Sequence, residues 1–382
     1  MKLAHLTTFW PITGGLSHYT NDLIFGMRAS RDVRHLVLGQ EGSDRVQTEA
    51  YACVPCYRRD RDYVEDVTKA AKENEVDVLV IQYAPDLFGD DNRLPRLVAS
   101  LRAVGVRPVV NMHSIYPEHW RTGFRPERTV GAFDRAIGQQ ASLITVHSAR
   151  MKADLVSHGL SPEGIAVIPH GTPTMPKPDQ AECRAALGLP QDSKLVLFFG
   201  YIWVGKGLEF LLNVFRDVSR QIPNAVLLVA GHTRRRLWAS YVTYLRLRSR
   251  LLGLGARSHF WGGYVPEQKV AQVFGAADVV AMPYLQDYSS VSGVVHQTAA
   301  MGKLMLCSRI PKFDEVEAID PALVAGQKNR GEWSQAMSRL LRDDELAARL
   351  RAKVDEFAVR THWNNVGKLH WEHYDRLMER RA

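Results

Sequence analysis

The sequence predicts an α/β fold in which two doubly wound parallel sheets follow one another along the chain. Apolar runs of strand length alternate with amphipathic stretches of helix length, an alternation typical of parallel sheets covered by helices. The chain has 382 residues, more than a single hydrophobic core usually holds, so two domains are expected. Its 46% hydrophobic and 24% charged residues are those of a folded globular protein.

The first half of the chain carries six apolar runs that predict strands. Between them lie stretches with helical periodicity, of which residues 17–28 and 64–74 are the clearest. This order predicts one Rossmann-like domain over residues 1–171. The predicted strands cover residues 2–7, 34–40, 77–83, 107–113, 143–148 and 165–171.

A proline-rich segment then separates the halves. Residues 172–180 hold three prolines and show no periodicity, which is the composition of a linker. Residues 181–358 repeat the strand and helix scheme and predict a second Rossmann-like domain. Its predicted strands cover residues 194–202, 225–232, 258–265, 278–284 and 303–308, and its clearest helices cover residues 208–221 and 267–277.

The C-terminal part of the sequence, from residue 343 onward, is helical throughout. Its last segment, residues 359–382, carries Trp363 and Trp371 among other aromatic residues at roughly helical spacing. We expect a helix this aromatic to pack on another part of the protein.

The most informative stretch runs from Ala276 to Ser308 and reads as strand, polar loop, helix, glycine turn and strand. Pro283 stops the strand, and Gly302 closes the helix. The free N–H groups and the positive dipole end of such a helix bind phosphate groups well. An ordinary crossover helix with a serine N-cap is the alternative interpretation.

Further candidate residues follow other predicted strands, and in open α/β sheets ligands bind at this edge. Gly14 and Gly15 permit a tight turn before a helix, His113 ends a strand where its imidazole can meet a substrate, and Lys206 precedes a helix. Each has a structural alternative when taken alone: a turn glycine, a structural histidine and a surface lysine.

The charge distribution favours anionic partners. The net charge is +8, and the segment from Arg234 to Arg257 holds seven arginines and no acidic residue, interleaved with aromatic and leucine residues. This segment predicts a helix on an anionic membrane surface or a patch for a phosphate-rich ligand, with a solvated arginine face as the alternative. No nucleic-acid partner is expected.

The remaining compositional features argue against several classes of protein. Cys53 and Cys56 form a C-x-x-C pair, but no second pair with ligand spacing follows, so we expect neither a metal site nor redox work. Asp90 and Asp91 are expected to be solvated. No apolar run reaches the ~20 residues of a membrane span, and the N-terminal sequence lacks a secretory signal. We therefore expect a cytoplasmic protein, in peripheral contact with the inner face of the membrane if the basic helix binds there.

Several segments in the same order resemble a known family. They are Gly14 and Gly15 after the first strand, His113, the closing strands "ASLITVHS" and "VIPHG", the segment "FFGYIWVGKGLEFLLNVF" with its G-x5-K-G pattern, and "GGYVPEQKVAQVFGAADVVAMPY" before the stretch from Ala276. Nearly the whole chain thus resembles the retaining glycosyltransferases of family 4. The resemblance implies the GT-B fold, two facing Rossmann-like domains with a C-terminal helix that crosses back to the first.

The resemblance also implies a reaction: transfer of a sugar from a nucleotide-diphosphate sugar to an acceptor hydroxyl, in glycan, polysaccharide or glycolipid biosynthesis. It implies no obligatory cofactor and no metal. Lys206 would contact the donor diphosphate, and His113 would lie beside the reacting sugar. The donor-binding residues implied are Gly14, Gly15, Tyr201, Lys206, Val265, Ser289, Ser290, Ser292, Gly293, Val294 and Gln297, and His18 would lie at the acceptor.

The sequence departs from the family pattern at two places. Two glutamates eight positions apart are usual in the helix loop, and here Ser289 and Gln297 occupy those positions. Gln297 can still hydrogen-bond ribose hydroxyls, whereas Ser289 cannot replace a carboxylate. The family's phosphate-binding arginine falls on Tyr201 or Trp203, neither of which is cationic. Lys206 would then hold the diphosphate with less help, unless one of Arg234 to Arg236 contributes.

Other functions fit parts of the pattern. A sugar-nucleotide epimerase of GT-B fold and an inactive nucleotide-sugar-binding homologue both remain open. A dinucleotide oxidoreductase is disfavoured because no G-x-G-x-x-G follows the first strand. The base, the donor sugar and the acceptor are not identified, although the loops at residues 83–93 and 116–128 are expected to shape the acceptor site.

Overall fold

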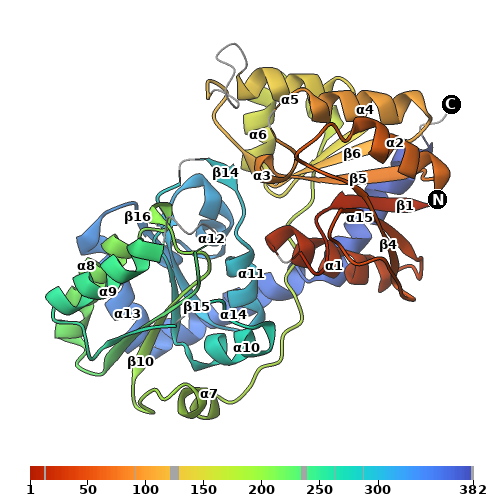
Figure 1. Ribbon diagram of the computed structural model, residues 1–382. Coiled ribbons are helices and arrows are strands. Elements are labelled where there is room, and N and C mark those ends of the chain that lie inside the picture. The colour runs from red at the N-terminus through yellow and green to blue at the C-terminus, as the bar shows by residue number, and fades with distance from the viewer. Residues whose placement is uncertain are drawn as a thin grey trace. The chain divides into compact units, whose positions relative to one another are not determined.

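A computed structural model describes residues 1–12, 14–89, 91–120, 129–233, 239–261, 263–286 and 288–379. The chain forms two compact units, whose elements are labelled in Figure 1. The first unit consists of Met1–Gly171, Tyr288–Val291 and Thr361–Ala382, and the second of Thr172–Asp287 and Ser292–Arg360. Each unit is built on its own parallel sheet, so the prediction of two doubly wound α/β sheets is confirmed.

Within the described residues, the sheet of the first unit has eight strands in the order β3-β4-β2-β1-β5-β6-β8-β9, and all neighbours are parallel except β3 and β4. The central strand β5 is buried along its whole length, as expected where helices cover both faces of a sheet. The strands are β1 (Leu3–Thr7), β2 (His35–Gln40), β3 (Val46–Gln47), β4 (Tyr51–Tyr57), β5 (Val78–Tyr83), β6 (Arg107–Met112), β8 (Leu143–Val146) and β9 (Ile165–Val167).

The six strands predicted for this unit are present, but the sequence did not predict β3 and β4. Strand β4 contains Pro55, which argues against a central strand. The proline is tolerated because β3 pairs only with Ala52 and Cys53, so β4 has no partner on that side at residue 55. Cys53 and Cys56 both lie on β4 as free thiols.

The helices of the first unit are α1 (Gly15–Arg28), α2 (Val64–Glu73), α3 (Pro85–Phe88), α4 (Arg93–Ala103), α5 (Val130–Gly138), α6 (Ala149–Ser157) and α15 (Trp363–Glu379). A short antiparallel ladder joins β7 (Ser114–Ile115) to β14 (Ser289–Ser290).

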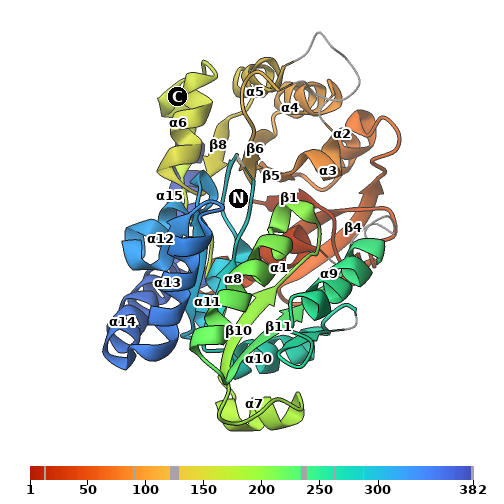
Figure 2. The same cartoon turned by 90° about the vertical axis from the view of Figure 1, so that its left-hand side faces the viewer.

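The sheet of the second unit has the strand order β12-β11-β10-β13-β15-β16 and is parallel throughout its described pairs. Figure 2 shows β10 and β11 running side by side. The strands are β10 (Lys194–Phe199), β11 (Ala225–Ala230), β12 (Ser258–Phe260), β13 (Val279–Met282), β15 (Leu304–Arg309) and β16 (Val324–Gly326). The helices are α7 (Gln180–Ala186), α8 (Leu208–Gln221), α9 (Ala239–Leu251), α10 (Glu267–Ala276), α11 (Gly293–Ala300), α12 (Asp314–Ile319), α13 (Arg330–Arg342) and α14 (Asp344–Arg360).

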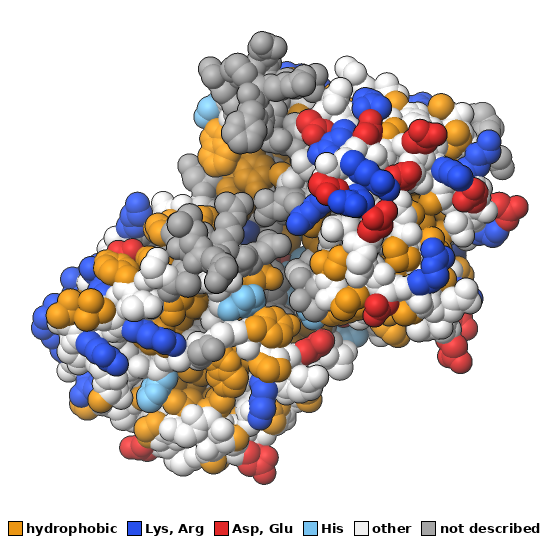
Figure 3. All heavy atoms as spheres, in the orientation of Figure 1, with side chains coloured by type: hydrophobic (Ala, Val, Ile, Leu, Met, Phe, Trp, Pro, Cys, Tyr) orange, Lys and Arg blue, Asp and Glu red, His pale blue; other side chains and the backbone are white. Residues whose placement is uncertain are grey.

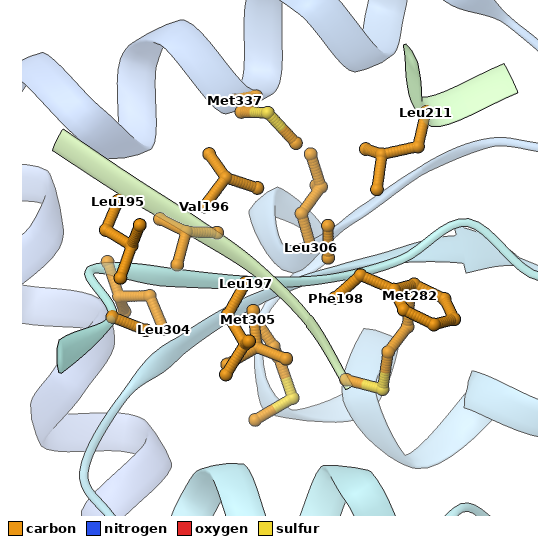
Figure 4. Close-up of a cluster of buried hydrophobic side chains, with 14 of the residues drawn as sticks. Leu195, Val196, Leu197, Phe198, Leu211, Met282, Leu304, Met305, Leu306 and Met337 are labelled. Carbon is orange, nitrogen blue, oxygen red and sulfur yellow. The ribbon is translucent and has the colours of Figure 1, made fainter. Parts of the chain in front are cut away.

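The core of this unit packs against both faces of the sheet (Figure 4). Val196 on β10 points to the side of Met337 on α13, whereas its neighbour Leu197 points to the opposite side with Met305. Each of these four side chains is fully buried. The continuous apolar sequence of β10 therefore reflects burial on two faces rather than on one.

The C-terminal helical stretch is not continuous, in contrast to the prediction. Helix α14 ends at Arg360 and α15 begins at Trp363. The Nδ1 atom of His362 accepts a hydrogen bond from the Asn364 N–H at 3.2 Å, so the imidazole satisfies a donor of the first turn of α15. Such local side-chain bonds compete with helix continuation and start a new helix instead.

Helix α15 packs closely on α1, with which it lies side by side in Figure 1. A Cβ atom on Gly367 would lie 2.4 Å from backbone atoms of Gly26, so the two helices touch through their backbones. The indole N–H of Trp371 donates to the Met27 carbonyl at 2.9 Å. The last helix of the chain is thus part of the core of the first unit.

A group of buried histidines lies next to this helix pair. His5 on β1 and His35 on β2 are joined through their ring nitrogens at 3.1 Å, and His370 on α15 is 2.9 Å from the Tyr374 hydroxyl. Burial lowers the pKa of His35 to about 4 and that of His370 to about 3, and it lowers the pKa of His5 well below its usual value. All three are therefore neutral in the folded protein at neutral pH.

Within the described ranges, no helix combines the length and the hydrophobicity that a membrane crossing requires.

Replacement of Gly367 by alanine is expected to destabilise the first unit by about 1 to 3 kcal/mol, because the added methyl group overlaps the backbone of α1. Gly164→Ala serves as the control, since a Cβ at this position meets no atom within 4 Å. Urea unfolding followed by circular dichroism measures both variants. Equal midpoints for Gly367→Ala and Gly164→Ala would contradict the close packing of α1 and α15.

Acidification from pH 7.5 to 5.5 is expected to lower the free energy of unfolding. Below pH 6.5 the histidines of the unfolded chain bind protons, whereas His5, His35 and His370 stay neutral in the folded state. The loss grows as the pH falls toward the folded pKa values and approaches about 1.4 kcal/mol per pH unit for each histidine.

Urea midpoints across this pH range measure the effect. His35→Gln is expected to reduce the pH dependence, while the exposed His119→Gln leaves it unchanged. A midpoint that is the same at pH 7.5 and 5.5 would show that the three histidines do not contribute.

Candidate functional site

The N-terminus of α11 supplies the first part of the candidate site, in the second unit. Ser292 is its N-cap residue, and no described side chain caps the helix. Gly293 is exposed, and Val294 and Gln297 are partly exposed, so these residues lie on one accessible side of the helix. The backbone donors of the first turn and the positive dipole end therefore lie next to solvent-accessible surface, where an anion can bind.

The loop after β10 supplies the second part. Gly207 has a φ of 69°, and a Cβ atom there would lie 1.9 Å from the carbonyl oxygen of Pro283. The loop that carries Lys206 thus rests directly on the loop that follows β13. Gly200, with a φ of 122°, lies beside the start of α11, since its Cβ position is 3.8 Å from Val294.

Lys206 is a cation without a nearby counter-ion. Its Nζ atom lies 3.5 Å from the centre of the Tyr284 ring, and no carboxylate of a described residue forms an ion pair with it. Burial and the neighbouring Lys312 hold the pKa of Lys206 well below its usual value. The ring stabilises the ammonium group in part, but the remaining positive charge favours a bound anion.

A set of aromatic rings follows β10, β11 and β12 in the same unit. The rings of Tyr201 and His232 are 5.0 Å apart, and those of His232 and Tyr264 are 5.1 Å apart. Such edge-to-face rings offer a surface on which a planar base can pack. Val265, which was predicted to bind the donor, is buried, and its side chain is part of the hydrophobic core of the second unit.

The first unit places His113 in a hydrogen-bonded chain. Its Nδ1 lies 3.1 Å from Nε2 of His147, its Nε2 lies 2.9 Å from the side-chain amide of Gln82, and Nδ1 of His147 lies 3.1 Å from the Ile168 carbonyl. The carbonyl can only accept, so the Nδ1–H group of His147 donates to it. The edge of the Tyr19 ring contacts His113 at 4.6 Å between centroids.

This arrangement restricts what His113 can do. Both of its ring nitrogens are engaged inside the protein, and burial together with His147 lowers its pKa well below the usual value. The ring is therefore fixed and neutral. This geometry suits an uncharged group that positions a ligand better than it suits one that exchanges protons.

Gly14 and Gly15 lie at the start of α1, shortly after a turn at residues 10–11. Gly14 has an extended φ of 179°, and neither residue has a left-handed φ that would make a tight turn. A Cβ atom at either position would meet no atom within 4 Å. The glycines thus leave open space in front of the helix. His18, one turn further, packs edge to face on Trp10 with 4.8 Å between ring centroids.

Ser289 and Ser290, which were predicted to bind the donor, fall within the first unit. They form β14, which pairs with β7, and both side chains are buried. The Ser289 hydroxyl donates to the Asp154 carboxylate on α6. The position of the missing glutamate is therefore taken by a serine that is itself hydrogen-bonded to a carboxylate.

The structure groups the predicted residues by unit. The second unit brings together Tyr201, Lys206, Ser292, Gly293, Val294 and Gln297, and the first unit contains Gly14, Gly15, His18, His113, Ser289 and Ser290. Arg234 to Arg236, Asp90 and residues 121–128 of the predicted acceptor loop lie outside the described residues. The described residues contain no cluster of three or more metal-ligating side chains.

Sequence reasoning missed several residues of these groups: Tyr284, Lys312, His147, Gln82 and Asp154. Lys312 carried a usable signal, since it comes four residues after the predicted strand at 303–308, at the sheet edge where ligands bind. His113 and His147 each directly follow a strand, β6 and β8, but their pairing could not be predicted because it depends on these two strands being neighbours in the sheet.

Comparisons with known proteins agree with this architecture. Residues 14–171 match the family described as "Glycosyl transferase 4-like domain", and residues 193–343 match "Glycosyl transferases group 1". Proteins of Mycobacterium tuberculosis and Mycobacterium bovis called D-inositol 3-phosphate glycosyltransferase are 30% identical over 259 residues, which is 63% of this chain and 49% of theirs. The chain thus spans about half the length of the curated relatives that it matches.

Solved structures share the fold over nearly the whole chain. The sucrose-phosphate synthase of Thermosynechococcus elongatus superposes with a TM-score of 0.78 at 18% identity, over 99% of both chains. Anabaena Alr3699/HepE, crystallised with UDP and glucose, superposes with a TM-score of 0.76 at 17% identity, over 98% of this chain and 99% of that one. With both of its domains matched in order and the same fold along its length, the chain belongs to the group 1, family 4-type glycosyltransferases.

Proposed function

We propose that the protein transfers a sugar, with retention of configuration, from a nucleotide-diphosphate sugar to an acceptor hydroxyl. The observation that carries this proposal is Lys206, a cation without a carboxylate partner in the described residues, in the same unit as the uncapped N-terminus of α11. Both features attract the charge of a diphosphate. Family membership and the name of the curated relatives support the reaction class.

The transfer reaction requires little from the protein beyond stabilisation of charge. As the bond from the sugar to the diphosphate breaks, negative charge grows on the leaving oxygen and the sugar gains oxocarbenium character. Lys206 and the backbone donors of Gly293 and Val294 would stabilise the leaving diphosphate before and after the bond breaks. We propose that the leaving phosphate accepts the proton of the acceptor hydroxyl, so that neither a protein nucleophile nor a metal ion is needed.

In this proposal the first unit binds the sugar and the acceptor. His113, fixed and neutral, would hydrogen-bond or pack on the donor sugar after a small adjustment of its partner Gln82. The open space before Gly14 and Gly15 leaves room for a ligand at the start of α1. His18 lies one turn away and would contact the acceptor. The acceptor class that we propose is a precursor of a glycan, polysaccharide or glycolipid.

A second surface supports contact with a membrane. On α9, Tyr244, Leu247 and Leu251 are spaced along one side of the helix, and Leu247 and Leu251 are 55% and 79% exposed. Arg246 and Arg250 are exposed beside them. Figure 3 shows basic and hydrophobic side chains mixed at the left edge, over the region of α8 and α9. We propose that this helix binds the surface of an anionic membrane; the cytoplasmic location stays a prediction.

Lys206→Ala is expected to lower transfer at least 100-fold, because the leaving charge loses its cation. Lys328→Ala, at an exposed position of the same unit, is the control. Release of nucleoside diphosphate is measured with UDP-, GDP-, ADP- and dTDP-glucose, and D-inositol 3-phosphate is the first acceptor to include.

The other outcomes of this assay separate the remaining functions. Conversion of the donor without any acceptor would identify an epimerase. Binding of a donor in a thermal-shift assay without turnover on any acceptor would identify an inactive homologue. If none of UDP-, GDP-, ADP- and dTDP-glucose binds, the proposed function is contradicted.

The double variant Leu247→Glu/Leu251→Glu is expected to lose binding to vesicles of phosphatidylcholine with 30% phosphatidylglycerol, since it removes apolar area and adds negative charge. Val359→Glu, at a residue of α14 that is 70% exposed, is the matched control and is expected to bind like the wild type. Co-sedimentation measures binding. A wild-type protein that stays in the supernatant with anionic vesicles would contradict the membrane contact.

A further inference from the structure

Three aromatic side chains of the first unit form a row, which we call the aromatic row: Tyr116, Trp120 and Tyr288. The ring centroids of Tyr116 and Trp120 are 5.6 Å apart, with 30° between the ring planes. Those of Tyr116 and Tyr288 are 4.5 Å apart, with 37° between the planes. Neighbouring rings of the row thus overlie each other rather than meet edge to face.

Strand pairing explains why two of these rings meet. Strands β7 and β14 are antiparallel, and Ile115 lies opposite Ser289. The next positions in the same register are Tyr116 and Tyr288. Side chains that face each other across such a pair are close enough to pack.

Trp120 is both exposed and held in place. Its N–H donates to the Pro117 carbonyl at 3.0 Å, and its own carbonyl accepts from the Val130 N–H, at the start of α5, at 2.9 Å. The residue is 41% exposed, and it is the only tryptophan among the exposed large hydrophobic residues in the described part of the chain. An aromatic ring that is already fixed loses little conformational freedom when a ligand binds to it.

The aromatic row begins close to His113, the residue proposed to lie beside the reacting sugar. Only β7 separates His113 from Tyr116, and three residues of extended chain span at most about 11 Å. Polar groups also lie near Trp120. Two residues before it, Glu118 forms an ion pair with Arg135 at 2.9 Å, and both side chains are partly exposed. A carboxylate and a guanidinium together can accept from and donate to hydroxyl groups.

We propose that the aromatic row binds a pyranose ring of the acceptor, with Trp120 as the surface on which the sugar packs. This inference rests on the proposed function and deepens it, because it names a carbohydrate as the part of the acceptor that the first unit recognises. The face of an aromatic ring carries partial negative charge, so it attracts the C–H groups on one face of a pyranose. The hydroxyl groups at the edge of the sugar stay available for hydrogen bonds.

The main alternative is that Trp120 serves only to cover Tyr116 and to stabilise the segment before α5. A structural ring would affect the stability of the protein but not its affinity for sugars. Single exposed aromatic residues are common on protein surfaces, so a second one is needed as a control. Phe25 on α1, which is 52% exposed in the same unit, is a matched choice.

Saturation-transfer difference NMR on the full chain tests the contact. The probes are methyl β-D-glucopyranoside, methyl β-D-galactopyranoside and methyl α-D-mannopyranoside, and the linear polyol sorbitol is the control ligand, which has hydroxyl groups but no pyranose face. The wild type is expected to transfer saturation to the ring C–H protons of at least one glycoside and not to sorbitol.

Variants of the row connect this signal to Trp120. Trp120→Ala is expected to weaken the affinity for the bound glycoside by about 3- to 10-fold, as for the loss of one ring contact. Trp120→Tyr is expected to restore most of the affinity, and Phe25→Ala to bind like the wild type. A lower thermal midpoint of Trp120→Ala with unchanged glycoside affinity would overturn the proposal and assign the ring a structural role.

A kinetic readout separates the acceptor from the donor. With a glycoside that the protein uses as acceptor, Trp120→Ala should raise the KM for the acceptor and leave the KM for the nucleotide sugar unchanged. Equal increases of both KM values would overturn the proposal, because the ring would then act on the whole site rather than on the acceptor.

The outcomes also distinguish this inference from the proposed function. If the wild type binds none of the four nucleotide sugars, the proposed function fails. If it binds a nucleotide sugar but transfers saturation to none of the three glycosides, the role of the aromatic row is overturned while the proposed function stands.

Discussion

The contact between Gly207 and the carbonyl of Pro283 is the constraint on which the second unit's site depends. Any side chain at residue 207 would collide with that oxygen, so the loop after β10 can rest on the loop after β13 only because glycine is there. The contact holds Lys206 over the Tyr284 ring. The end of β10 also lies beside the start of α11, since the Cβ position of Gly200 is 3.8 Å from Val294, so that one cation and one helix N-terminus share the same edge of a parallel sheet.

The two units differ in the charge of their buried polar side chains. In the second unit, the Lys206 ammonium forms no ion pair with a carboxylate of the described residues, which favours a bound anion. The first unit buries several histidines, and burial lowers the pKa of His5, His35, His113 and His370, so that these rings are neutral at neutral pH. His113 is part of this neutral network, which explains why its ring is fixed rather than free to exchange protons.

The structure shows what surrounds a residue that departs from the family pattern. Ser289 is not an isolated loss of a carboxylate, since its hydroxyl donates to Asp154 on another element of the first unit. The carboxylate of Asp154 thus lies beside the position where the family pattern has a glutamate.

The sequence by itself determined the two parallel sheets, most of their strands, the helices between them and the strand ends that carry Lys206 and His113. These features depend on local hydrophobic periodicity and on turn residues, which are read along the chain. Only the tertiary structure decided the pairing of His113 with His147, the contact of the Lys206 ammonium with the Tyr284 ring, the burial of Ser289 in the first unit and the backbone contact of α15 with α1. Each of these joins residues far apart in sequence, whose distance is set by strand order and packing rather than by any local pattern.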